Sequence, residues 1–111
     1  MCGIFGIIAK EKSRYSNKFL KNSLINLAML SETRGKDSSG LCFLNHNENG
    51  FDVIKGPIPA NDLLKRPKVI NTLNNVFSKE NNSKLKLAIG HARLVTNGTQ
   101  LEADNNQPVL K

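Results

Sequence analysis

A cysteine stands directly behind the initiator methionine in the opening stretch MCGIFG. Small residues at the second position permit removal of Met1, which would make Cys2 the first residue of the chain. An α-amino group has a pKa of about 8, so a useful fraction is neutral and can take the thiol proton through a bridging water. Gly3 lets a substrate approach this terminus closely. The pattern is compatible with a nucleophile that carries its own base, but taken alone it is a weak signal, and it favours a small buried thiol heading a core strand.

Two later stretches carry further groups for recognition, RGKDSSG at residues 34–40 and GHARLVTNG at residues 90–98. Arg93 falls at the mouth of an expected strand, and the hydroxyl of Thr96 follows three residues later. A guanidinium binds a carboxylate through two parallel hydrogen bonds, and a nearby hydroxyl adds another donor. Arg93 and Thr96 are therefore candidates for binding the carboxylate of a substrate.

Each of these residues also has an interpretation without chemistry. Arg93 can form a surface salt bridge, Thr96 can be a turn hydroxyl, and Arg34 can be a last-turn cation near a helix C-terminus. His91 stands in an apolar strand, which is typical of a core histidine. The residues 37–39 are good turn formers. These alternatives stay open at the level of single residues.

The groups must be positioned by the apolar segments around them. Residues 2–9 form a continuous apolar run, which predicts a strand buried on both faces. Ser16 can cap a helix that should end near Arg34, with Gly35 supplying a left-handed stop. The apolar stripe of this helix consists of Leu20, Leu24, Leu27 and Ala28.

The remainder of the chain predicts a hairpin, a helix and a strand. Residues 40–45 and 51–55 flank the turn-rich HNENG and read as the hairpin. After a proline-punctuated connector, we expect an amphipathic helix over residues 69–77 and a strand over residues 84–92, with Leu85, Leu87 and Ile89 on one face. Residues 108–111 resemble the beginning of another strand. This order predicts an α+β domain, a sheet covered by helices, with residues 1–111 forming one domain.

Composition excludes several classes of protein. The 111 residues include 39% hydrophobic and 5% aromatic residues, enough for an aliphatic core. The net charge of +7 is spread along the chain without a nucleic-acid motif or interleaved aromatics, so we expect no nucleic-acid partner. Cys2 and Cys42 form neither a disulfide framework nor a CxxC pair, and we expect no metal site and no cofactor. The apolar opening is too short for a signal peptide or membrane span, which favours a cytoplasmic protein without a membrane partner.

Four stretches, in this order and spacing, resemble the glutaminase domain of class II glutamine amidotransferases, which are N-terminal-nucleophile (Ntn) hydrolases. They are MCGIFG, RGKDSSG, GHARLVTNG and NNQP, and together they span Cys2 to Pro108. The family patterns are roughly C-G-I-x-G, R-G-x-D-S-x-G, G-H-x-R-x-x-T-x-G and N-x-[HQ]-P. Four matches in order are far more specific than any one of them.

The resemblance implies a fold, an activity and a site. The fold would be the four-layer αββα sandwich of Ntn hydrolases. Cys2 would attack the side-chain amide of L-glutamine, release ammonia and leave a γ-glutamyl thioester for water to hydrolyse. Arg93 matches the arginine that binds the α-carboxylate of glutamine, and Thr96 matches the threonine beside it. Arg34 matches an arginine packed near the nucleophile, while Asn97 and Gly98 fall in the substrate-pocket turn.

Other features depart from the family or fall outside the sequence. Leu94 stands where glucosamine-6-phosphate synthases have tryptophan, and Gln107 is closer to the N-A-Q-P of amidophosphoribosyltransferases. The acceptor of ammonia, on a synthase domain or subunit, is therefore open. The oxyanion Asn–Gly pair and the aspartate for the α-amino group would follow Lys111, so we expect residues 1–111 to be the N-terminal part of a longer sandwich. The alternative function is a truncated glutaminase-like domain that binds without turnover.

Overall fold

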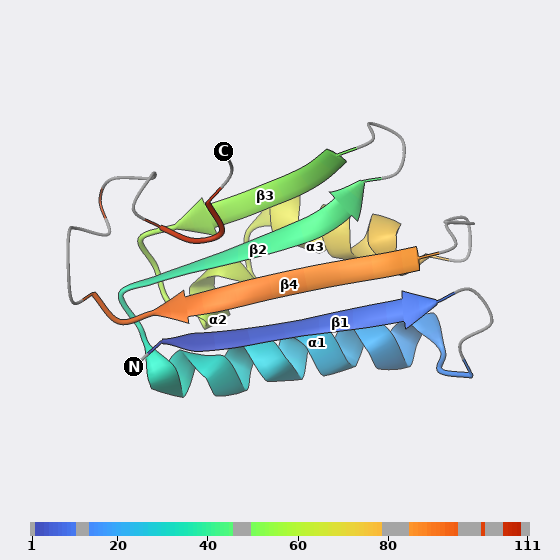
Figure 1. Ribbon diagram of the computed structural model, residues 1–111, viewed down its shortest axis with the longest axis horizontal. Coiled ribbons are helices and arrows are strands. Elements are labelled where there is room, and N and C mark those ends of the chain that lie inside the picture. Colours follow the sequence, from blue (N-terminus) through green and yellow to red (C-terminus); the bar gives the residue numbers. More distant parts are fainter. Residues whose placement is uncertain are drawn as a thin grey trace.

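The computed structural model describes residues 2–10, 14–45, 50–78, 85–95, 101 and 106–109. Their strands form one antiparallel sheet in the order β1-β4-β2-β3, and the helices lie behind it (Figure 1). The predicted α+β class is confirmed. The elements are β1 (Gly3–Lys10), α1 (Asn17–Ser31), the 3-10 turn η1 (Glu32–Arg34), β2 (Ser38–Asn45), β3 (Gly50–Gly56), α2 (Ala60–Leu63), α3 (Pro67–Val76) and β4 (Leu85–Arg93).

Helix α1 begins where the sequence predicts. The Ser16 hydroxyl accepts a hydrogen bond from the backbone N–H of Phe19 at 3.1 Å, which satisfies one of the free donors of the first turn. The buried residues of α1 are Leu20, Leu24 and Ala28, three members of the predicted stripe. Helix α1 therefore packs its apolar side against β1 and β4, the two neighbouring strands at one edge of the sheet.

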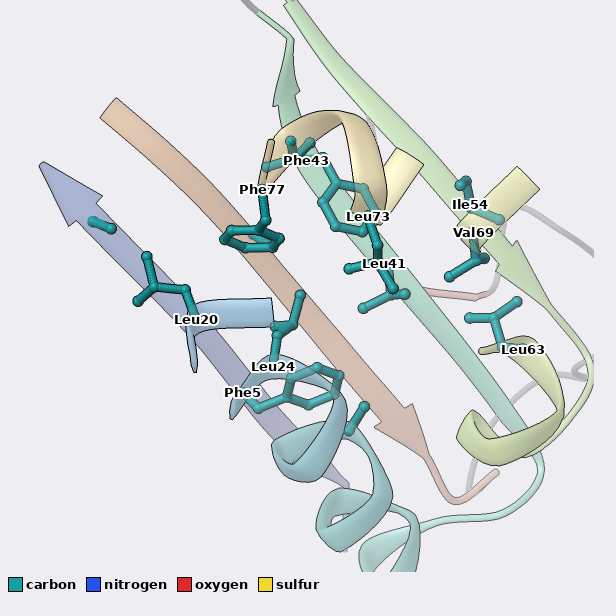
Figure 2. Packing of buried hydrophobic residues seen from close by; sticks show 14 residues of the cluster. Phe5, Leu20, Leu24, Leu41, Phe43, Ile54, Leu63, Val69, Leu73 and Phe77 are labelled. Carbon is teal, nitrogen blue, oxygen red and sulfur yellow. The ribbon is translucent and has the colours of Figure 1, made fainter. Parts of the chain in front are cut away.

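The core lies between the sheet and the helices (Figure 2). Alternate residues of the strands point into it, including Phe5 of β1 and Leu41 and Phe43 of β2, all at most 8% exposed. From the helical side, α1 contributes Leu24 and α3 contributes Leu73. Small residues of β4 face these large side chains, because Phe5 lies opposite Gly90 and Phe43 opposite Ala88.

The face of the sheet opposite the helices, here called the open face, retains exposed apolar side chains. The exposed fractions are 80% for Ile4, 67% for Ile8, 52% for Phe51 and 42% for Ile89. The prediction that the first strand is buried on both faces is therefore wrong for the described residues. Residues 2–9 are all apolar, so the sequence of this strand contains no alternation with polar residues that would indicate which face is exposed.

The hairpin, the second helix and the last long strand are confirmed within two residues of their predicted ends. Leu85, Leu87 and Ile89 share a face as predicted, because they pair with Lys10, Ile8 and Gly6 of β1, but that face is the open one. The short helix α2 was not predicted in the proline-punctuated connector.

Two predictions about chain ends and turns are wrong. Gly35 is extended, with φ −176° and ψ 132°, and so provides no left-handed stop to α1. A side chain there is excluded for another reason: a Cβ would lie 2.6 Å from the carbonyl oxygen of Arg93. The strand predicted to begin in residues 108–111 is absent from its described part, because Pro108 is in a bend and Val109 in an irregular stretch; residues 110 and 111 lie outside the described residues. Among the described helices, none combines the length and apolar composition needed to cross a bilayer.

Candidate functional site

Cys2 lies at a corner of the sheet, where β1 begins and β4 ends (Figure 1). The residue is exposed, and its Sγ atom donates a hydrogen bond to the carbonyl oxygen of Leu94 at 3.7 Å. Gly3 pairs with Ala92, so the next positions outward are Cys2 and Arg93. The sulfur is therefore accessible and directly beside the segment that follows β4.

Arg34 reaches the same corner from the helical side. A Cβ on Gly3 would lie 3.1 Å from the Cβ of Arg34, so the side-chain stem of Arg34 packs against the start of β1. A cleft of about 520 Å³ opens here along the free edge of β1. It is lined by Cys2, Gly3, Ile4, Phe5, Gly6, Leu27, Leu30, Ser31 and Arg34. The sulfur and the Arg34 guanidinium-bearing side chain thus border one concave surface.

Arg93 lies on the other side of the sheet. Its neighbour Ala92 pairs with Gly3 on the helical face, so alternation places Arg93 on the open face. There its Nη1 donates a hydrogen bond to the Oδ1 atom of Asn106 at 3.2 Å. Asn106 is 1% exposed, which makes it a fixed partner for the guanidinium. Arg93 is not among the residues that line the cleft of Arg34, whereas Cys2 lines that cleft and also contacts the segment after β4.

Residues 106–108 of the NNQP stretch are held against the open face next to Arg93. The Nζ atom of Lys55 donates hydrogen bonds to the carbonyl oxygens of Asn106 at 2.9 Å and Pro108 at 3.0 Å. Gly40 permits this docking, because a Cβ there would lie 2.6 Å from the Cδ atom of Pro108. Figure 1 shows this segment, in red, beside the end of β3. Residues far apart in sequence therefore converge around the guanidinium of Arg93.

Three of the six predicted site residues are thus placed at one corner: Cys2, Arg34 and Arg93. Thr96, Asn97 and Gly98 lie outside the described residues. Sequence reasoning missed the roles of Lys55 and Asn106. Asn106 belongs to the NNQP motif, so the resemblance could have identified it as a candidate site residue, whereas no motif or spacing in the sequence includes Lys55.

His91 is buried on the open face, opposite Ile4 and Gly40. Burial lowers the pKa of its imidazole from the ordinary 6.5, and the positive charge of Arg93 lowers it further. His91 is therefore held neutral at physiological pH. This agrees with the interpretation of a core histidine, positioned next to the arginine without carrying a charge that would repel it.

Acidification from pH ~7.5 to ~5.5 is expected to destabilise the protein through His91. With the folded pKa below 6.5, the unfolded state binds more protons between the two values, so stability falls as the pH drops through 6.5 and stops falling below the folded pKa. Urea unfolding at each pH measures the effect, and His91→Gln should show a smaller fall. Equal falls in both proteins would contradict the assignment.

The second thiol, Cys42, differs from Cys2 in accessibility. It is 4% exposed, and burial raises the pKa of its thiol, with the carboxylate of Asp52 contributing in the same direction.

Within the described residues, no group of three or more His, Cys, Asp or Glu side chains is arranged to hold a metal ion. Comparison of the chain with protein-family models, curated proteins and solved structures found no match.

Proposed function

We propose that this chain carries the nucleophile and the carboxylate-binding arginine of a class II glutamine amidotransferase. The observation that carries the proposal is the position of Cys2: its sulfur is exposed and lies 3.7 Å from the carbonyl oxygen of Leu94, and Cys2 and Arg93 are the positions next to the last pair of the β1–β4 ladder. A sealed or distant sulfur would have been incompatible with attack on a bound amino acid. The four motifs of the resemblance support the same function, because residues from all of them meet at this end of the sheet.

The reaction would begin after removal of Met1. The sulfur of Cys2 attacks the side-chain amide carbon of glutamine, and the thiol proton passes through a water to the free α-amino group. The carbon–nitrogen bond of the tetrahedral adduct then breaks, and the protonated amine returns the proton to the leaving ammonia. Water hydrolyses the γ-glutamyl thioester to glutamate and regenerates the thiol. No cofactor takes part in this sequence.

The two arginines would have different roles. Arg93 would bind the α-carboxylate of glutamine, as its match in the resemblance implies, because a guanidinium forms two parallel hydrogen bonds to a carboxylate. Its Nη1 atom also donates to the Oδ1 atom of Asn106. Thr96, Asn97 and Gly98 complete this pocket in the resemblance. Arg34, whose stem packs at Gly3, supports the start of β1 and borders the cleft at Cys2. Glutamine would therefore be bound across the corner of the sheet.

We also propose the αββα arrangement of Ntn hydrolases, with a second sheet packed on the open face. The exposed apolar residues Ile4, Ile8, Phe51 and Ile89 support it, because isolated sheets rarely leave such a row in water. An experimental structure of the mature protein decides this point. A second sheet about 10 Å from the first would confirm the arrangement, and a solvated open face would contradict it.

Ammonia would pass to an acceptor on a synthase domain or subunit. The departures at Leu94 and Gln107 leave the chemistry of that acceptor open. Two free thiols, one of them proposed as a nucleophile, fit a reducing compartment such as the cytoplasm.

The proposal is tested first by the state of the N-terminus. Intact mass spectrometry of the purified protein is expected to show a chain lighter by one methionine, and release of ammonia from L-glutamine should scale with that processed fraction. The free amine is the proposed base, so an unprocessed chain should be inactive. Full retention of Met1 in a preparation that turns over glutamine would exclude the mechanism.

A further inference from the structure

Asp37 joins the segment before β2 to the segment after β4 by two hydrogen bonds. Its backbone N–H donates to the carbonyl oxygen of Arg93 at 3.1 Å, and its Oδ2 atom accepts from the backbone N–H of Val95 at 2.7 Å. The second bond is short and involves a carboxylate, which makes it stronger than a bond between neutral groups. Asp37 therefore holds the peptide groups on both sides of Leu94, one through its backbone N–H and the other through its carboxylate.

The segment held in this way lies beyond the ladder pairing of β4. The β2–β4 pairing ends at Arg93, so Leu94 and Val95 lie beyond the sheet. The side chain of Leu94 is 42% exposed and anchors the segment poorly. Close backbone approach is possible because Gly35 has no side chain to separate the two segments. Asp37 thus replaces the sheet pairing for the two residues that follow β4.

The carbonyl oxygen between the two held groups is the one that accepts from Cys2. Leu94 lies between the two residues that Asp37 binds, and its oxygen is the partner of the Cys2 sulfur. Movement of residues 93–95 would therefore change the distance between the nucleophile and the guanidinium of Arg93. A misplacement of about 1 Å can cost an enzyme about 100-fold in rate.

We propose that Asp37 is a positioning residue, whose carboxylate fixes the backbone of residues 93–95 so that the carbonyl oxygen of Leu94 faces the sulfur of Cys2. This inference rests on the proposed function for its effect on catalysis, but not for its structural content. Asp37 contacts no atom of the substrate in the proposed reaction. The sequence alone gives it only the role of a turn former.

Two variants distinguish the contribution of the negative charge of Asp37 from that of its hydrogen-bond acceptor. Asp37→Ala removes the acceptor, and amide exchange of Val95, followed by NMR, should accelerate about tenfold or more while core amides stay protected. The kcat/KM for glutamine should fall by about 10- to 100-fold. Asp37→Asn keeps an acceptor oxygen, so we expect most of the activity to return, with the Val95 amide proton shifted upfield by the loss of charge. Asp62→Ala removes an exposed helical carboxylate and should change none of these quantities.

The outcomes that would overturn the inference are specific. Unchanged Val95 exchange in Asp37→Ala would show that the carboxylate does not hold the segment. Faster exchange with unchanged kcat/KM would show that the segment does not position the site. If Asp37→Ala does not fold, an unshifted Val95 amide proton in Asp37→Asn would likewise contradict it. A wild-type protein that releases no ammonia would remove the proposed function, while Val95 exchange would still decide whether Asp37 fixes residues 93–95.

Discussion

Replacing Cys2 with serine is expected to reduce ammonia release from glutamine by at least about 10³-fold, without loss of the fold. Serine also permits removal of Met1, so the terminal amine is kept and only the attacking atom changes. A hydroxyl is a far weaker acid than a thiol of pKa about 8.5, so an amine of pKa about 8 takes its proton much less readily, and the hydroxyl is the weaker nucleophile. Ammonia release under saturating glutamine measures the effect.

Cys42→Ser provides the matched control, because it removes the other thiol of the chain. Cys42 is buried, and its raised pKa keeps it protonated and unreactive. We expect this variant to retain its activity, although burial of a hydroxyl costs some stability. Iodoacetamide should alkylate Cys2 in the folded protein and block turnover at the same rate. Activity that survives in Cys2→Ser, or is lost only in Cys42→Ser, is incompatible with the proposed nucleophile.

Local signals explain why the elements were predicted well. The Ser16 cap and the stripe of Leu20 and Leu24 are properties of neighbouring residues, and the structure reproduces both. The turn-rich stretch between residues 45 and 51 likewise predicted the hairpin. Secondary structure follows from such short-range chemistry whenever the tertiary contacts agree with it.

The face of a strand is a long-range property, which local patterns did not reveal. The alternation of exposed and buried residues in β1 depends on where α1 packs, and an all-apolar strand carries no mark of that choice. Leu85, Leu87 and Ile89 were correctly grouped on one face, yet the core takes the smaller Ala88 and Gly90 because Phe43 and Phe5 fill the space above them.

The site shows the same limit. The contact between Asp37 and Val95 joins residues 58 apart, and the contact between Lys55 and Asn106 joins residues 51 apart. No spacing rule predicts either contact. Gly35 was expected for its left-handed freedom, but its actual requirement is space for the backbone of Arg93. Described residues from the four stretches lie at one end of the sheet, and the structure identifies the atoms that hold them together.

Replacing Arg93 with lysine is expected to raise the KM for glutamine by about 10- to 100-fold, the equivalent of losing one strong hydrogen bond to a charged group. Lysine keeps the positive charge but cannot form the two parallel bonds to a carboxylate. It also shortens the reach to Asn106, whose Oδ1 accepts from Arg93 Nη1 at 3.2 Å, so the melting temperature must be measured alongside the kinetics. Arg66→Lys, at the exposed start of α3, is the control and should leave KM unchanged.

A second substrate tests whether Arg93 binds the α-carboxylate of glutamine directly. An analogue of glutamine that lacks the α-carboxylate should be a poor substrate for the wild-type protein, with kcat/KM lower by about 10- to 100-fold. In Arg93→Lys, the same change of substrate should cost much less, because the partner of the carboxylate is already gone. Equal losses in both proteins would mean that the guanidinium and the carboxylate act independently. Arg93 would then be a structural residue that holds Asn106 against the open face, and glutamine would have to be oriented at Cys2 by other groups.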